Sequence, residues 1–234
     1  MKIAGLQKMT LLDFPGKVAC TVFLDGCNFR CPFCHNTPLL EGKAEQYMSQ
    51  EEFFEFLKKR KGILDGVCIT GGEPTLQKEL PEFLRKIKEL GYSVKLDTNG
   101  YRPTILRNLV EEGLVDYVAM DIKNCPSRYS ETTGVDIQIE KIEESIRYLV
   151  FGSLDYEFRT TVVSPLHDEQ SIREMAKWLT ITTEGKLLKA LYLQAYMERE
   201  TVIFGGLSAP SKQELERYKY LLVHTARTIE LRGV

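Results

Sequence analysis

The chain has 234 residues, of which 43% are hydrophobic, and a formal net charge of −2. This length fits one large domain or two small ones, with enough apolar side chains to bury a sizeable core. The low net charge without a basic run argues against a nucleic-acid partner, and no apolar stretch is long enough to span a membrane.

Short apolar runs rich in β-forming residues predict six buried strands, which follow an irregular lead-in over residues 1–17. The predicted strands are 18–24, 67–70, 93–96, 117–120, 156–163 and 190–194. Apolar residues at helical spacing follow each strand. The predicted helices lie within residues 49–62, 80–90, 103–112, 139–149, 172–179 and 211–225. The pairs Ser49/Glu52 and Ser211/Glu214 form capping boxes that mark the start of the first and last helices.

Strands that alternate with helices of this length indicate βαβ units and a parallel sheet with its helices outside. A complete eight-fold barrel takes about 250 residues. Six units in 234 residues therefore predict an incomplete (β/α)6 barrel, open along one side, with a doubly wound open sheet as the alternative. We expect one domain over residues 1–234, with the lead-in at 1–17, the partial barrel at 18–200 and a C-terminal helix and tail at 201–234.

Three cysteines directly follow the first predicted strand. Cys27, Cys31 and Cys34 have the spacing C-x3-C-x2-C, and thiolates are the ligands that iron–sulfur clusters and zinc prefer. Three thiolates would leave one iron of a 4Fe-4S cluster without a protein ligand, whereas electron-transfer ferredoxins close all four positions. A zinc site with His35 or another cysteine as fourth ligand is the alternative. The scattered Cys20, Cys68 and Cys125 are expected to pack as small hydrophobic side chains.

Polar residues also follow the later predicted strands. Because ligands of parallel α/β folds bind at the carboxyl ends of the strands, these residues are candidates for one binding site. They are Gly71, Gly72, Glu73, Asp97, Thr98, Asn99, Asp121, Lys123, Arg159 and Gln194. Structural interpretations are also open: the glycines as a tight turn, Glu73 as a solvated turn charge, Asp97 and Asn99 as turn formers, Asp121 and Lys123 as a local ion pair, and Gln194 as a satisfied interior amide. We expect His167 to lie in a loop and His224 to lie on a surface helix.

The cysteine motif, with Phe33 before its last cysteine, resembles that of the radical S-adenosylmethionine superfamily, and so does the turn Gly71-Gly72-Glu73-Pro74. A narrower resemblance rests on residues 5–8, 13–17, 26–36 and 121–123. In these residues the chain resembles glycyl-radical-enzyme activating proteins, and most of all those that activate anaerobic ribonucleoside-triphosphate reductase. Pyruvate formate-lyase activating enzyme is a near relative of that group. This chain has Phe14 where that relative has glycine, a difference that bears on the surface facing the partner.

The resemblance implies the incomplete barrel of that superfamily and one 4Fe-4S cluster ligated by Cys27, Cys31 and Cys34. S-adenosylmethionine would bind the open iron, and its reductive cleavage would give methionine and a 5′-deoxyadenosyl radical that takes a hydrogen from a glycine of a partner enzyme. The resemblance also implies roles for the candidate residues. Phe33 would pack at the adenine, and Gly71, Gly72 and Glu73 would bind the amino group. Arg159 would pair with the carboxylate, Lys123 would assist the methionine end and Gln194 would line the lumen, while Asp97, Thr98 and Asp121 would bind the ribose, the sulfonium or a monovalent cation.

The resemblance also implies a protein substrate, a glycyl radical enzyme, and an external one-electron donor such as flavodoxin or ferredoxin. We expect no nucleic-acid or membrane partner, and a place in the reducing cytoplasm because no apolar signal sequence opens the chain. The alternatives are a radical S-adenosylmethionine enzyme that acts on a small molecule, an iron–sulfur electron-transfer protein and a zinc-binding module.

Overall fold

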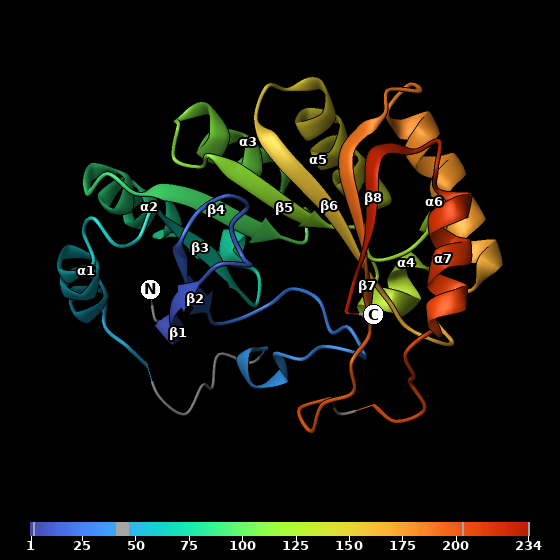
Figure 1. The fold of residues 1–234 in the computed structure, drawn as a ribbon, viewed down its shortest axis with the longest axis horizontal. Coiled ribbons are helices and arrows are strands. Elements are labelled where there is room, and N and C mark those ends of the chain that lie inside the picture. The colour runs from blue at the N-terminus through green and yellow to red at the C-terminus, as the bar shows by residue number, and fades with distance from the viewer. Residues whose placement is uncertain (2, 41–46, 203, 234) are drawn as a thin grey trace. The chain divides into compact units, whose positions relative to one another are not determined.

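Strands and helices alternate along the chain in the computed structural model, which describes residues 1, 3–40, 47–202 and 204–233 (Figure 1). The strands are β1 (Ile3–Thr10), β2 (Ala19–Leu24), β3 (Gly66–Gly71), β4 (Ser93–Thr98), β5 (Tyr117–Asp121), β6 (Asp155–Val162), β7 (Leu188–Ala195) and β8 (Ala226–Arg232). The helices are α1 (Gln50–Lys59), α2 (Leu80–Glu89), α3 (Pro103–Glu111), α4 (Pro126–Thr133), α5 (Ile139–Phe151), α6 (Glu169–Thr182) and α7 (Lys212–Leu221), with short 3-10 helices η1 (Thr37–Leu39) and η2 (Pro74–Leu76).

The described strands follow one another in the sheet in chain order, from β1 at one end to β8 at the other. A linear order confirms the predicted α/β fold with an open sheet. It also rules out the doubly wound alternative, in which the strand order reverses at a switch point.

The chain forms two compact units, of which the first contains Met1–Asn28, Pro38–Thr98 and Thr104–Ala119. Within this unit β1 is antiparallel to β2, whereas β2, β3 and β4 are parallel. Helix α2 packs on β4, and Phe53 of α1 lies 5.4 Å from Phe83 of α2 between ring centroids. Because the three strands are parallel, the loops that follow them leave from the same edge of the sheet.

The second unit contains Phe29–Thr37, Asn99–Pro103 and Met120–Val234. Its strands β6, β7 and β8 are parallel, with Arg159 beside Tyr192, and Gln194 beside Arg232. Helix α7 packs on β7 and β8, and α6 contacts α4, α5 and α7 (Figure 1). The register therefore places the polar residues of β6, β7 and β8 in rows across the sheet.

The six predicted strands are present as β2 to β7, and both predicted capping boxes form. The prediction of an irregular lead-in is wrong, because β1 occupies residues 3–10. The C-terminal tail was also incompletely predicted, since it contains β8, and α4 was missed. These elements carry many polar or exposed residues and weak periodicity, so their pairing and packing decide their structure rather than intrinsic propensity.

The three scattered cysteines, Cys20, Cys68 and Cys125, are buried free thiols, as predicted. None of the described helices is long and apolar enough to cross a membrane.

Candidate functional site

In the first unit, the turn after β3 lies against the backbone that leads into the cysteine motif. The Gly72 N–H donates to the Leu24 carbonyl and the Glu73 N–H to the Gly26 carbonyl, both at 2.8 Å. A Cβ at Gly72 would collide with the Gly26 oxygen, and one at Gly71, where φ is +117°, would collide with the Leu24 backbone. Both glycines are therefore required by the close approach of two backbones.

Asp25, the residue that follows β2, is also held in place, by contacts that the sequence did not predict. The buried Asp25 accepts a short hydrogen bond from the Tyr47 hydroxyl at its side chain, and its carbonyl accepts one of 2.6 Å from Gln77 Nε2. The N–H of Gly26 donates to the Leu39 carbonyl at 2.6 Å. These partners are remote in sequence, so no local pattern could indicate them.

Glu73 and Thr98, both predicted site residues, lie together in this unit. Glu73 is only 1% exposed, and its Oε1 accepts hydrogen bonds from the Thr98 hydroxyl at 2.8 Å and from the Thr75 N–H and hydroxyl at 3.1 and 2.5 Å. The same carboxylate caps η2. Glu73 is therefore a buried carboxylate held in one orientation, not a solvated turn charge.

Asp97, another predicted residue, forms an ion pair within its own strand. Lys95 Nζ lies 2.6 Å from Asp97 Oδ1, and the lysine side chain is only 2% exposed. Sequence reasoning missed Lys95, although a lysine in the middle of an apolar strand indicates a buried partner.

In the second unit, Asp121 lies between two cations. Its Oδ1 is 3.0 Å from Arg159 Nε and its Oδ2 is 2.9 Å from Lys123 Nζ. Burial alone would raise the pKa of Asp121, but the two cations outweigh it and lower the pKa to about 2. Burial likewise opposes the charge of Lys123, yet Asp121 raises the pKa of Lys123 above its usual value. The three predicted residues thus form a charged triad with one excess positive charge.

The cysteine motif continues in this unit beside the triad. Phe33 packs in an apolar cluster with Val163, Leu166 and Tyr196, and Cys31 contacts this cluster. The Lys123 ammonium lies 5.9 Å from the Phe33 ring centroid.

The motif cysteines Cys27, Cys31 and Cys34 are half-buried and in no disulfide bond. The Cys34 N–H donates to the Cys31 carbonyl at 3.1 Å, and burial raises the pKa of the Cys34 thiol. Across the described residues, no group of three or more histidine, cysteine or acidic side chains is arranged as a ready metal site. Ligation of a cluster by these cysteines therefore stays a prediction.

The structure also places His35, the alternative zinc ligand, and Gln194, a predicted site residue. His35 Nε2 lies 2.7 Å from the Met197 carbonyl. Gln194 is half-buried in β7, in register between Thr161 of β6 and Arg232 of β8.

Two further buried groups were missed by sequence reasoning. His167 is indeed in a loop, but it is only 2% exposed, and its Nε2 lies 2.8 Å from the Lys123 carbonyl. Glu157 is 1% exposed and forms two hydrogen bonds of 3.2 Å with Arg232, whose guanidinium lies 3.4 Å from the centroid of Tyr192. The second group was missed because the strand that carries Arg232 was missed.

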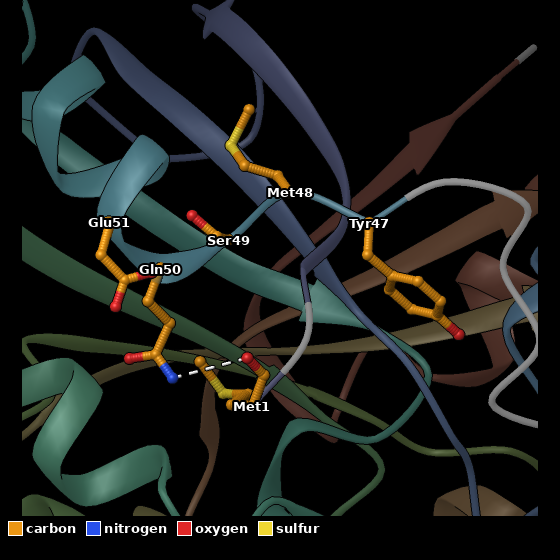
Figure 2. A pocket seen from close by; sticks show the side chains of 6 residues that line it. All are labelled: Met1, Tyr47, Met48, Ser49, Gln50 and Glu51. Carbon is orange, nitrogen blue, oxygen red and sulfur yellow. Dashed lines mark hydrogen bonds between the residues drawn. The ribbon is translucent and has the colours of Figure 1, made fainter.

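A surface hollow of about 350 Å³ lies where α1 begins (Figure 2). It is lined by Met1, Tyr47, Met48, Ser49, Gln50 and Glu51. A neighbouring hollow of about 280 Å³ lies along α1 and includes Lys86 of α2. None of the predicted cofactor residues lines either hollow, so we assign them no part in the site.

Comparison with known proteins identifies the family. Residues 21–179 match the family described as the radical SAM superfamily. A protein of Methanocaldococcus jannaschii, provisionally named as a glycyl-radical enzyme activating enzyme, is 37% identical over 75% of this chain and 74% of its own length. The pyruvate formate-lyase-activating enzyme of Clostridium pasteurianum is 33% identical over 53% of this chain and 52% of its own length. A protein of Thermococcus kodakarensis provisionally named as GTP 3′,8-cyclase is 32% identical over 85% and 64%.

Solved structures show the same fold. A radical SAM methyltransferase from Sphaerobacter thermophilus superposes with a TM-score of 0.73 at 14% identity, over 96% of this chain and 68% of that one. A domain of pyruvate-formate lyase-activating enzyme from Bacteroides vulgatus superposes with a TM-score of 0.58 at 20% identity, over 72% of this chain and 99% of that one. The match over residues 21–179 shows that the chain belongs to the radical S-adenosylmethionine superfamily.

Proposed function

We propose that this chain is a glycyl-radical-enzyme activating enzyme, with anaerobic ribonucleoside-triphosphate reductase as the first partner to test. The observation that carries the proposal is the 37% identity, over three-quarters of both chains, to the Methanocaldococcus jannaschii protein named for this activity. The likeness to the Clostridium pasteurianum activating enzyme supports it.

Membership of the superfamily implies a 4Fe-4S cluster and S-adenosylmethionine. The thiols of Cys27, Cys31 and Cys34 fit such a cluster because thiolate is its usual protein ligand. When bound, the cluster and S-adenosylmethionine supply a one-electron cleavage to methionine and a 5′-deoxyadenosyl radical, which takes a hydrogen atom from glycine. The protein's part is to bind, orient and exclude water.

The charged triad would hold the carboxylate end of S-adenosylmethionine. Arg159 and Lys123 flank Asp121 within 3.0 Å, and their combined excess of one positive charge suits an anion. The low pKa of Asp121 keeps the triad in one charge state at physiological pH. Arg159 would pair with the carboxylate and Lys123 would assist the methionine end.

For the amino group of S-adenosylmethionine, the proposed contacts are Gly71, Gly72 and Glu73. Glu73 is a fixed buried carboxylate, and the glycine turn exposes backbone that can approach a ligand closely. The remaining proposed contacts are Phe33 at the adenine, Asp97, Thr98 and Asp121 at the ribose, the sulfonium or a monovalent cation, and Gln194 in the lumen.

The proposed partner is a second protein, and the proposed electron donor is an external flavodoxin or ferredoxin. We place this reaction in the cytoplasm, where such donors are reduced. A loop of the partner that carries the glycine would have to reach the cofactor.

A second candidate is radical chemistry on a small molecule. Its support is the 32% identity over 85% of this chain to the Thermococcus kodakarensis protein named for GTP cyclisation, although the chain spans 64% of that protein. The two candidates differ in the substrate that receives the radical.

One anaerobic experiment separates them. Reconstituted protein is reduced with dithionite and mixed with S-adenosylmethionine and either the candidate reductase or GTP. The activase predicts a glycyl radical doublet by electron paramagnetic resonance with the reductase, and no consumption of GTP. Consumption of GTP without a doublet would favour the second candidate, and no 5′-deoxyadenosine in any mixture would remove both.

A further inference from the structure

A buried histidine that the proposed chemistry does not use lies behind the charged triad. His167 follows β6 in the loop that leads to α6 and is 2% exposed. Both of its ring nitrogens contact backbone groups. A buried imidazole with two defined partners has one orientation and one preferred tautomer.

The backbone contacts identify that tautomer. Nδ1 lies 3.2 Å from the Val163 nitrogen and 3.3 Å from the Val163 carbonyl, so its own contacts would allow it to accept or to donate. Nε2 lies 2.8 Å from the Lys123 carbonyl, which can only accept, so in the neutral ring Nε2 carries the hydrogen and Nδ1 accepts from the Val163 N–H. Burial lowers the pKa of His167 to about 4, which keeps the ring neutral and this arrangement intact at neutral pH.

The backbone of Lys123 is held from its other side by α4. The Lys123 N–H donates to the hydroxyl of the buried Tyr129 at 3.3 Å. The next residue, Asn124, donates from Nδ2 to the Thr132 hydroxyl at 2.9 Å and to the Leu166 carbonyl at 2.8 Å. The peptide groups on both sides of the Lys123 Cα are therefore fixed.

The same two elements also hold the cysteine motif. Val163 and Leu166, from the histidine loop, pack against Phe33. The Thr133 carbonyl at the end of α4 accepts a 2.7 Å hydrogen bond from the Arg30 N–H. A Cβ at Gly134 would collide with the Arg30 carbonyl, so the backbones at Gly134 and Arg30 are in close contact. One frame, made of α4 and the loop of residues 163–167, thus supports both Lys123 and the cysteine motif.

We propose that His167 is a positioning residue, which sets Lys123 between Asp121 and Phe33 so that its ammonium is oriented for the carboxylate-bearing end of S-adenosylmethionine. This inference rests on the proposed function, because it assumes that Lys123 faces that ligand. His167 itself touches no reacting atom and acts only through the backbone of Lys123.

The test compares two substitutions of the histidine with a matched control. His167→Phe removes the donor to Lys123, His167→Gln keeps an N–H donor, and His224→Phe removes an exposed histidine. The readouts are iron per chain after anaerobic reconstitution, the Kd for S-adenosylmethionine by calorimetry, and the rate of 5′-deoxyadenosine formation. Loss of a partner that orients a metal ligand typically weakens affinity about 10- to 100-fold, and taking the lower end for a residue that orients Lys123, we expect His167→Phe to raise the Kd about tenfold.

The expected pattern is specific to positioning. His167→Gln should restore the Kd to within about threefold of wild type, because one hydrogen bond is retained, and iron content should not change. In a Lys123→Met background, His167→Phe should add no further loss, since its effect passes through Lys123. If His167→Phe does not fold, Tyr129→Phe removes the opposite anchor and should raise the Kd in the same direction.

The outcomes against the inference are distinct from those against the proposed function. A wild-type protein that binds S-adenosylmethionine, together with an unchanged Kd in His167→Phe or in Tyr129→Phe, would overturn this inference alone. So would an effect of His167→Phe that persists in full in the Lys123→Met background. A wild-type protein that neither binds nor cleaves S-adenosylmethionine would overturn both.

Discussion

The glycine turn at the end of β3 and the charged triad of β5 and β6 are built on different principles. The turn consists of backbone: Gly71 and Gly72 approach the Leu24 and Gly26 backbones so closely that neither position has room for a side chain. The triad consists of side chains, with Asp121 between Lys123 and Arg159. The turn depends on shape and the triad on charge.

This difference determines how each region can fail. A close backbone approach has no flexible atom that can move aside, so any added atom displaces the main chain itself. An ion pair instead tolerates small shifts, but removal of one member leaves the others buried without compensation. Steric substitutions should therefore damage the turn, and neutralising substitutions or acid should damage the triad and its supports.

The largest effect is expected from Gly72→Ala. The new Cβ would overlap the Gly26 carbonyl oxygen, which belongs to the backbone just before the cysteine motif. We expect a loss of about 3 kcal/mol in the free energy of unfolding, the upper part of the range for overpacking, and less iron after reconstitution. Urea unfolding and iron analysis measure both. Gly205→Ala is the control because a Cβ there meets no atom within 4 Å; equal stability of the two variants would contradict the steric account.

The next effect is acid destabilisation through His167. Its folded-state pKa is lowered from 6.5 to about 4 by burial, so the unfolded chain binds a proton in this range that the folded chain does not. The folded protein therefore has its full free energy of unfolding above pH 6.5, and it loses roughly 3 kcal/mol of it through His167 as the pH falls toward 4. Urea unfolding at several pH values measures this slope. His167→Phe should flatten the slope between pH 6.5 and 4 and His224→Phe should leave it; an unaltered slope in His167→Phe would refute the assignment.

Asp121→Asn is expected to have a smaller effect, because the triad is partly exposed. The substitution keeps the shape and leaves Lys123 and Arg159 facing each other without the carboxylate. We expect a loss of about 2 kcal/mol at pH 7, below the full range for a buried pair, and weaker binding of S-adenosylmethionine. Asp155→Asn is the control, since its pair with Lys189 is exposed and should contribute less than about 1 kcal/mol. Similar losses in the two variants would show that the triad is no more than a surface pair.

Thr98→Val is expected to have the smallest effect. It removes the hydroxyl that donates to Glu73 at 2.8 Å but leaves the two donors from Thr75. One lost hydrogen bond to a buried carboxylate costs about 1.5 kcal/mol. Thr180→Val, whose hydroxyl bonds an exposed helix carbonyl, is the comparison. If chemical denaturation shows the same small cost for both, Glu73 does not depend on Thr98.

Much of the fold could be predicted because its central strands are apolar and its helices amphipathic. The terminal strands could not, since β1 and β8 carry the polar residues of half-exposed strands and are defined by their pairing. For the site, the sequence located the triad residues and the glycine turn by their positions at strand ends. It could not predict Lys95, His167 or Glu157, whose importance comes from burial and from partners that only the folded chain brings near.

The turn and the triad are both proposed to bind S-adenosylmethionine, for radical chemistry on a glycine of a partner protein. The most direct measurement is electron paramagnetic resonance of the reduced, reconstituted protein with S-adenosylmethionine and anaerobic ribonucleoside-triphosphate reductase. Our account predicts a glycyl radical doublet on the reductase that requires S-adenosylmethionine and is lost in Cys31→Ala. A mixture that yields 5′-deoxyadenosine without any doublet on the reductase would contradict the proposed activity.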